Sequence, residues 1–108
     1  MPTVDTPFER LSLVYRDVPG VTRASMMGQP CLKVGRVLFA SSQRGGDAVV
    51  LKLAPERVAA LVADGAGAPF APGGRAFAKW VQIEGVGWER LVSLADEAFE
   101  GARTGATA

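Results

Sequence analysis

The ten residues CLKVGRVLFA, numbered 31–40, decide the fold of this chain. Gly35-Arg36 separates two apolar runs, and a two-residue connection that begins with glycine meets the requirement of a type II′ hairpin turn. Directly opposed residues of a hairpin share a face, so Val34 opposes Val37. By the same count Leu32 opposes Phe39. We expect these four apolar side chains to be buried beneath helices. The other face then carries Cys31, Lys33, Leu38 and Ala40.

Strand patterns continue on both sides of this hairpin. The turn residues QRGGD at 43–47 lead into AVVLKL at 48–53, where apolar side chains alternate along the segment. Further strands are expected at 77–83 and, before the hairpin, at about 22–27. Residues 65–75 are rich in glycine, alanine and proline, and we expect them to form a loop.

A helix is predicted before the strands. Thr6 is a suitable N-cap, Pro7 suits the first helical position, and Glu9 completes a capping box with Thr6. Apolar residues then recur at helical spacing until Pro19-Gly20 ends the pattern. The helix is therefore expected over about residues 7–17.

Two more helices complete the predicted fold. One is expected over about 55–63, and the other over about 88–102, where a continuous apolar stripe is present. The resulting order is α-β-β-β-α-β-α, with strands joined mainly by short hairpins. This order indicates a two-layer α+β fold in which helices cover one face of an antiparallel sheet. We expect a single domain over 1–108 that ends in a flexible tail at 101–108, where Gly105→Ala would be nearly neutral.

The composition excludes several classes of function. The chain has 108 residues, no histidine and one cysteine, which removes the commonest general base and metal ligand and any internal disulfide. Cys31 is interpreted as a buried structural thiol. No apolar run approaches the roughly 18 residues of a membrane span, and the first residues lack the features of a signal peptide. We therefore expect a cytoplasmic protein without catalytic residues, cofactor, metal or membrane contact.

Charges are unevenly distributed, although the net charge is only +1. Residues 20–55 carry five basic side chains against one acidic side chain, whereas residues 84–108 carry five acidic against two basic. One part of the surface is therefore expected to be electropositive and another electronegative. The basic segment predicts contacts to phosphate groups from Lys33, Arg36, Arg44 and Lys52.

Trp80 adds an aromatic side chain to these basic residues. If Val81 and Ile83 point to the core, Trp80 lies on the face of the sheet without helices, together with Lys33 and Lys52. An aromatic ring among cations is typical of a surface that binds nucleic acid. We therefore predict a weak electrostatic contact with DNA through Lys33, Arg36, Arg44, Lys52, Arg75, Lys79 and Trp80.

Two other functions fit the same region. The apolar side chains of that face, such as Leu38 and Val50, fit a homodimer or a contact with another protein equally well. The loop at 65–75 ends in Gly73-Gly74-Arg75, which could fold over a small ligand at the rim of the sheet. No residue suited to proton transfer stands out beside that loop.

Short motifs extend over about residues 19–100. They are Pro19–Val21, Gly28–Gly35, Phe39-Ala40, Leu51–Leu53, Pro55-Glu56, Ala71-Pro72, Trp80-Val81 and Trp88–Leu91. In their order and spacing these motifs resemble the MmcQ/YjbR family, with proteins related to the TfoX N-terminal domain as a neighbouring possibility. The resemblance implies the two-layer architecture of secretion-chaperone-like folds and a winged, antiparallel-sheet surface described as DNA-binding. It implies no catalytic residue and no cofactor.

Overall fold

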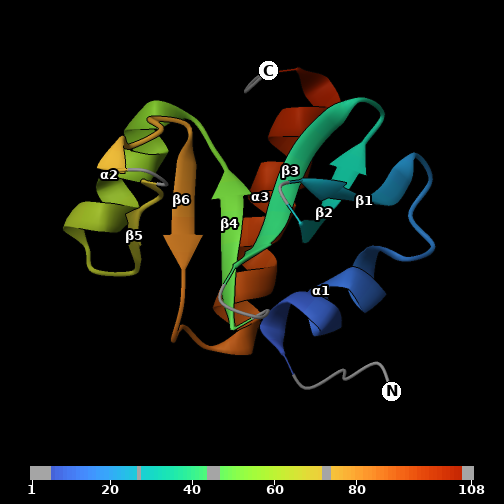
Figure 1. Ribbon diagram of the computed structural model, residues 1–108, viewed down its shortest axis with the longest axis horizontal. Coiled ribbons are helices and arrows are strands. Elements are labelled where there is room, and N and C mark those ends of the chain that lie inside the picture. Colours follow the sequence, from blue (N-terminus) through green and yellow to red (C-terminus); the bar gives the residue numbers. More distant parts are fainter. Residues whose placement is uncertain (1–5, 27, 44–46, 72–73, 106–108) are drawn as a thin grey trace.

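Three helices pack on a six-stranded antiparallel sheet, which confirms the predicted α+β class. The computed structural model in Figure 1 describes residues 6–26, 28–43, 47–71 and 74–105. Within these ranges the strands lie in the spatial order β1-β2-β3-β4-β6-β5. In chain order the elements are α1 (Pro7–Tyr15), β1 (Val21–Met26), β2 (Gln29–Val34), β3 (Val37–Gln43), β4 (Ala48–Lys52), α2 (Pro55–Ala63), β5 (Gly67–Pro69), β6 (Trp80–Ile83) and α3 (Trp88–Thr104).

The observed order contains two strands more than α-β-β-β-α-β-α. One is β1, which agrees with the strand expected at about 22–27 but is not counted in that order. The other is β5, which lies inside the predicted loop at 65–75. A Cβ atom added to Gly67 would lie 2.5 Å from Cγ2 of Val81, so glycine is what allows β5 to approach β6. The strand expected at 77–83 begins only at Trp80, because the preceding residues form a turn.

The central hairpin has the predicted turn, but its register changes within the strands. Val34 pairs with Val37, and Gly35 has the positive φ of 62° that the turn requires. Leu32, however, pairs with Ala40 and not with Phe39, since a bulge between Leu32 and Lys33 leaves Phe39 as an extra residue in β3. The expected pairing of Leu32 with Phe39 is therefore wrong.

The bulge also changes which side chains of β3 reach the core. Phe39 and Ala40 are both fully buried in the core, so the prediction that Ala40 lies on the opposite face is wrong. Leu32 and Val34 are buried as predicted, and Val37 is partly buried against the same core. Lys33 pairs with Leu38 one residue away from the core-facing pair, on the predicted opposite face.

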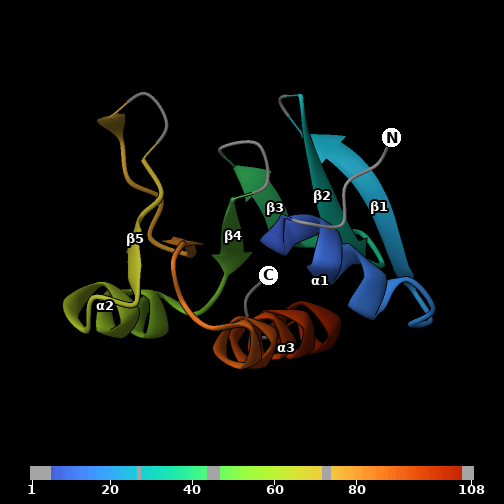
Figure 2. The same ribbon diagram turned by 90° about the horizontal axis from the view of Figure 1, so that it is seen from below.

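Three aromatic rings join the helices to the sheet. Phe39 of β3 meets Tyr15 of α1 and Phe99 of α3, with ring centroids 5.3 and 5.5 Å away. The Tyr15 hydroxyl donates a hydrogen bond to the Asp96 carboxylate on α3. Burial, together with this carboxylate, raises the pKa of Tyr15 well above its usual range. These contacts fix α1 and α3 on one side of β3 (Figure 2).

The first helix begins where the sequence predicts but ends at Tyr15, before the expected residue 17, and the Glu9 carboxylate of the expected capping box bonds to Arg23 instead; the third helix differs at its end. Thr6 is the N-cap of α1, and its hydroxyl oxygen accepts a hydrogen bond from the Glu9 amide at 3.3 Å. Helix α3 continues to Thr104, so the expected tail at 101–108 overlaps the helix, and residues 106–108 lie outside the described ranges. Gly105 caps α3 with a φ of 80°. A side chain there would be strained, so the structure leads us to expect that Gly105→Ala destabilises the helix end and is not nearly neutral. None of the helices in these ranges is long and apolar enough to cross a bilayer.

Candidate nucleic-acid interface

Within the described residues, one face of the sheet carries no helix (Figure 2), and the strand register places basic side chains on it. Val81 and Ile83 of β6 are buried in the core, which directs Trp80 and Gln82 to the opposite side. Lys52 at the end of β4 pairs directly with Trp80. We call this side the helix-free face; its side chains include Lys33, Leu38, Val50, Lys52, Trp80 and Gln82.

An open depression of about 540 Å³ lies where β4 ends and β6 begins. Figure 1 shows these two strand ends together, beside the segment that connects β5 to β6. We call this depression the rim site; it is lined by Lys52, Arg75, Ala76, Phe77, Ala78, Lys79 and Trp80. Its volume is within the range of roughly 300–1,000 Å³ that is usual for small-ligand sites.

Backbone hydrogen bonds hold the wall of the rim site in place. The Trp80 amide donates to the Phe77 carbonyl at 3.1 Å, which closes a turn over residues 77–80. The Phe77 amide donates to the Phe70 carbonyl at 3.0 Å, and Lys79 accepts from the Leu53 amide at 2.9 Å. The segment is therefore anchored to the chain after β5 and to the end of β4. Its aromatic and basic side chains project from a fixed backbone.

The three cations of the rim site have no carboxylate partner within the described residues. Lys52, Arg75 and Lys79 form no ion pair there, and no acidic residue lines the depression. Four other arginines are each paired with a carboxylate: Arg23 with Glu9, Arg57 with Glu97, Arg90 with Asp64 and Arg103 with Glu100. The rim site is therefore a local concentration of uncompensated positive charge.

The structure brings together part of the predicted set. Lys52, Arg75, Lys79 and Trp80 line one depression, as a common contact surface requires. Lys33 is half-buried on β2, two strands away from β4, or about 10 Å across the sheet. Arg36 is exposed in the β2–β3 turn, at the same end of the sheet as the end of β4. Arg44 lies outside the described residues.

Phe77 belongs to the site and was missed by sequence reasoning. Its side chain is 44% exposed, and its ring centroid lies 5.9 Å from that of the buried Phe70. The segment 77–83 was interpreted as a strand, in which Phe77 would share a face with the core-facing Val81. The two aromatic residues on either side of Ala78-Lys79 are the signal that could have indicated a ligand-binding turn.

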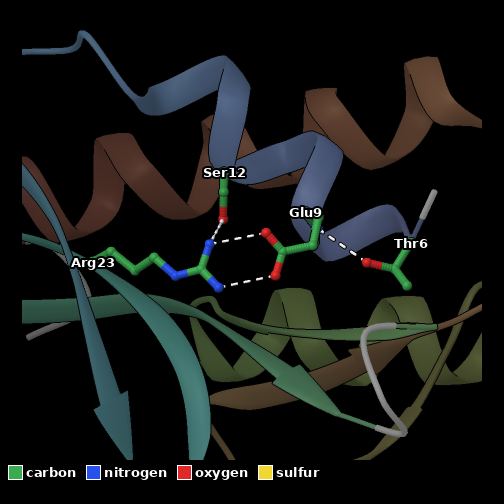
Figure 3. Close-up of polar contacts among 4 residues, drawn as sticks. All are labelled: Thr6, Glu9, Ser12 and Arg23. Carbon is green, nitrogen blue, oxygen red and sulfur yellow. Dashed lines mark hydrogen bonds and ion pairs between the residues drawn. The ribbon is translucent and has the colours of Figure 1, made fainter. Parts of the chain in front are cut away.

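A second basic region, between α1 and β1, has a different arrangement. Arg23 donates two hydrogen bonds to the Glu9 carboxylate, both at 2.9 Å, and a third to Ser12 at 3.4 Å (Figure 3). The hydrogen-bonded Arg23 holds the pKa of Glu9 below its usual range. We call this region the α1–β1 corner; a hollow of about 300 Å³ beside it is lined by Glu9, Ser12, Leu13, Tyr15, Arg16, Val21, Arg23 and Leu32.

The described residues include carboxylates and a free thiol, which are side-chain types that can hold a metal ion. They contain no cluster of three or more histidine, cysteine, aspartate or glutamate side chains that could hold a metal ion. Cys31 is fully buried, as expected, and burial raises the pKa of its thiol, although the nearby Lys33 opposes this effect. Among the described residues, the rim site combines cations with aromatic side chains, and no acidic residue lines it.

Comparison with known proteins identifies the family. The model of the YjbR family matches residues 16–100. The chain therefore belongs to the YjbR family, and the resemblance seen in its motifs is confirmed. No curated protein and no solved structure matches the chain. Membership of the family assigns no ligand to this YjbR domain, because a shared fold does not fix a function.

Proposed function

We propose that this YjbR domain binds DNA through its helix-free face, with the cations of the rim site in contact with phosphate groups. The observation that carries this proposal is the convergence of Lys52, Arg75 and Lys79 without a carboxylate among them. Lysine and arginine that the fold leaves unpaired remain available to neutralise phosphates and release their counterions. Lys33 and Arg36 extend the contact surface across β2 and its turn.

The acidic part of the molecule supports a defined orientation. On α3, Asp96 accepts from Tyr15, and Glu97 is paired with Arg57. Helix α3, which carries both groups, lies with the other helices on one side of the sheet (Figure 2), and its buried residues belong to the core on that side. DNA would therefore meet the cations while the carboxylates of α3 face away from it.

The expected affinity is modest, because the net charge of +1 adds little long-range attraction. Contacts to phosphates position a protein on DNA without specifying a sequence. We expect sequence-independent binding, with a dissociation constant at the micromolar end or weaker near physiological salt.

Fluorescence anisotropy of a labelled duplex, measured over a series of salt concentrations, tests the proposal. If Lys33, Lys52, Arg75 and Lys79 all meet phosphates, the slope of log K against log salt should be roughly −3.6. Lys33→Glu combined with Lys52→Glu should abolish binding; because both lysines are half-buried, a urea melt of the double variant has to show that it is still folded. Arg16→Glu is the matched control, since Arg16 is exposed at the far end of α1 and should leave binding almost unchanged.

The alternative function, a homodimer or a protein contact through the same face, gives a different result in this experiment. An absent signal at low salt, or a signal insensitive to salt, would overturn the DNA proposal and favour a protein partner. Light scattering then tests for a dimer. Val50 is only 1% exposed and adds no apolar surface to this face, so such a contact would depend on Leu38 and Trp80.

A further inference from the structure

We infer that the rim site accepts a single-stranded segment of DNA, with an unpaired base in contact with Phe77 and Trp80. This inference rests on the proposed function and names the form of DNA that the site takes. Phe77 is a large aromatic side chain left 44% exposed at a position fixed by its backbone hydrogen bond to Phe70. An exposed ring on a held backbone offers a stacking surface that needs little ordering when a base arrives.

The turn over residues 77–80 places two rings at one depression. Phe77 and Trp80 occupy its first and last positions, and both line the rim site together with the intervening Lys79. Trp80 is half-buried beside Lys52, with which it pairs across β4 and β6. Rings and cations therefore line one hollow together, which suits a single strand that offers both unpaired bases and phosphates.

A duplex cannot use these rings in the same way. Its bases are stacked on one another and present only their edges in the grooves. A single strand exposes the faces of its bases, and stacking on aromatic side chains is the common means of binding them. The depression of about 540 Å³ has the size of a small-ligand site, so it suits one inserted base and not the width of a helix.

The test compares labelled oligothymidine of twelve nucleotides with a duplex of the same length, each titrated with the full chain at low salt. We expect at least tenfold tighter binding of the single strand. Three phosphates neutralised by Lys52, Arg75 and Lys79 should give a single-strand salt slope of roughly −2. Phe77→Leu and Trp80→Leu should each weaken single-strand binding by about fivefold to 150-fold, the range that loss of one stacking contact produces.

Variants of Phe77 separate stacking from folding. Phe77→Tyr keeps an aromatic face and should bind the single strand as the parent chain does, whereas Phe77→Leu keeps apolar volume and should not. Both variants should have the same urea midpoint of unfolding as the parent chain. Equal affinity for the two DNA forms, with Phe77→Leu without effect, would overturn the single-strand inference and leave the proposed function standing. Binding of neither form would overturn both.

Discussion

The α1–β1 corner and the rim site are both basic, but the fold uses their cations differently. At the α1–β1 corner, Arg23 is held by Glu9 and Ser12 at the junction of helix and sheet. At the rim site, Lys52, Arg75 and Lys79 have no carboxylate partner among the described side chains. The cation of the first region joins two elements, whereas the cations of the second stay unpaired among the described residues.

This comparison shows why counting charges along a chain misplaces a binding surface. Arg23 contributes to the positive balance of residues 20–55, yet Glu9, from outside that segment, neutralises it. Arg75 and Lys79 lie beyond the same segment and complete the uncompensated cluster. The availability of a cation is therefore a property of the folded structure, and it follows from which carboxylates the fold brings close.

The largest expected effect contrasts an aromatic ring of the core with one of the rim site. Phe39→Ala should lower the free energy of unfolding by about 3–5 kcal/mol, because it leaves a cavity between α1, α3 and the sheet. Phe77→Ala should lower it by about 1 kcal/mol or less, because that ring is 44% exposed. Urea denaturation measures both values. Equal losses would show that Phe77 is a structural residue and would remove the distinction between the two regions.

The sequence predicts the framework of this fold because its signals are local. Gly35 in the central turn and the alternation of Val49 with Val50 can be recognised without knowledge of distant residues. The bulge at Phe39 could not be predicted in this way, since it is stabilised by packing against Tyr15 and Phe99, which are far away in the sequence. Strand β5 was missed for a similar reason, because its short Gly-Ala-Pro segment resembles a loop until Val81 lies beside it.

The candidate site was likewise predictable in part. Trp80 and Lys52 follow from strand alternation, which requires only that Val81 and Leu51 face the core. Phe77 did not follow, because a turn replaces the first residues of the predicted strand and changes the direction of its side chain. Turns of this kind depend on hydrogen bonds to other segments, here to Phe70, and leave little trace in residue periodicity.

A smaller effect is expected at the N-cap of α1, which supports the α1–β1 corner. Thr6→Ala removes the oxygen that accepts from the Glu9 amide and should lower the free energy of unfolding by about 1 kcal/mol. Ser93→Ala on the exposed side of α3 is the control and should change stability by no more than about 0.5 kcal/mol. Neither change should alter the DNA binding that we propose for the rim site. If Thr6→Ala lowered the anisotropy of the labelled DNA under conditions in which the variant is fully folded, the α1–β1 corner and the rim site would be coupled.

The smallest expected effect is a pH dependence that isolates the ion pair of the α1–β1 corner. Arg23 depresses the pKa of Glu9 in the folded chain, whereas a glutamate in the unfolded chain titrates near about 4.3. A depressed folded pKa contributes stability above the unfolded value and loses it as the pH falls through the folded value.

Glu9→Gln should therefore destabilise the chain by less than about 1 kcal/mol at pH 7, because Glu9 and Arg23 are partly exposed and solvent screens their attraction. The difference between the two proteins should shrink as the pH falls below about 4. Arg103 lowers the pKa of Glu100 in the same way, but this group is common to both proteins and cancels in the difference. Paired urea titrations at pH 7 and pH 3 measure the effect. A difference that stays constant between the two pH values would mean that Glu9 stabilises the corner through packing and not through its charge.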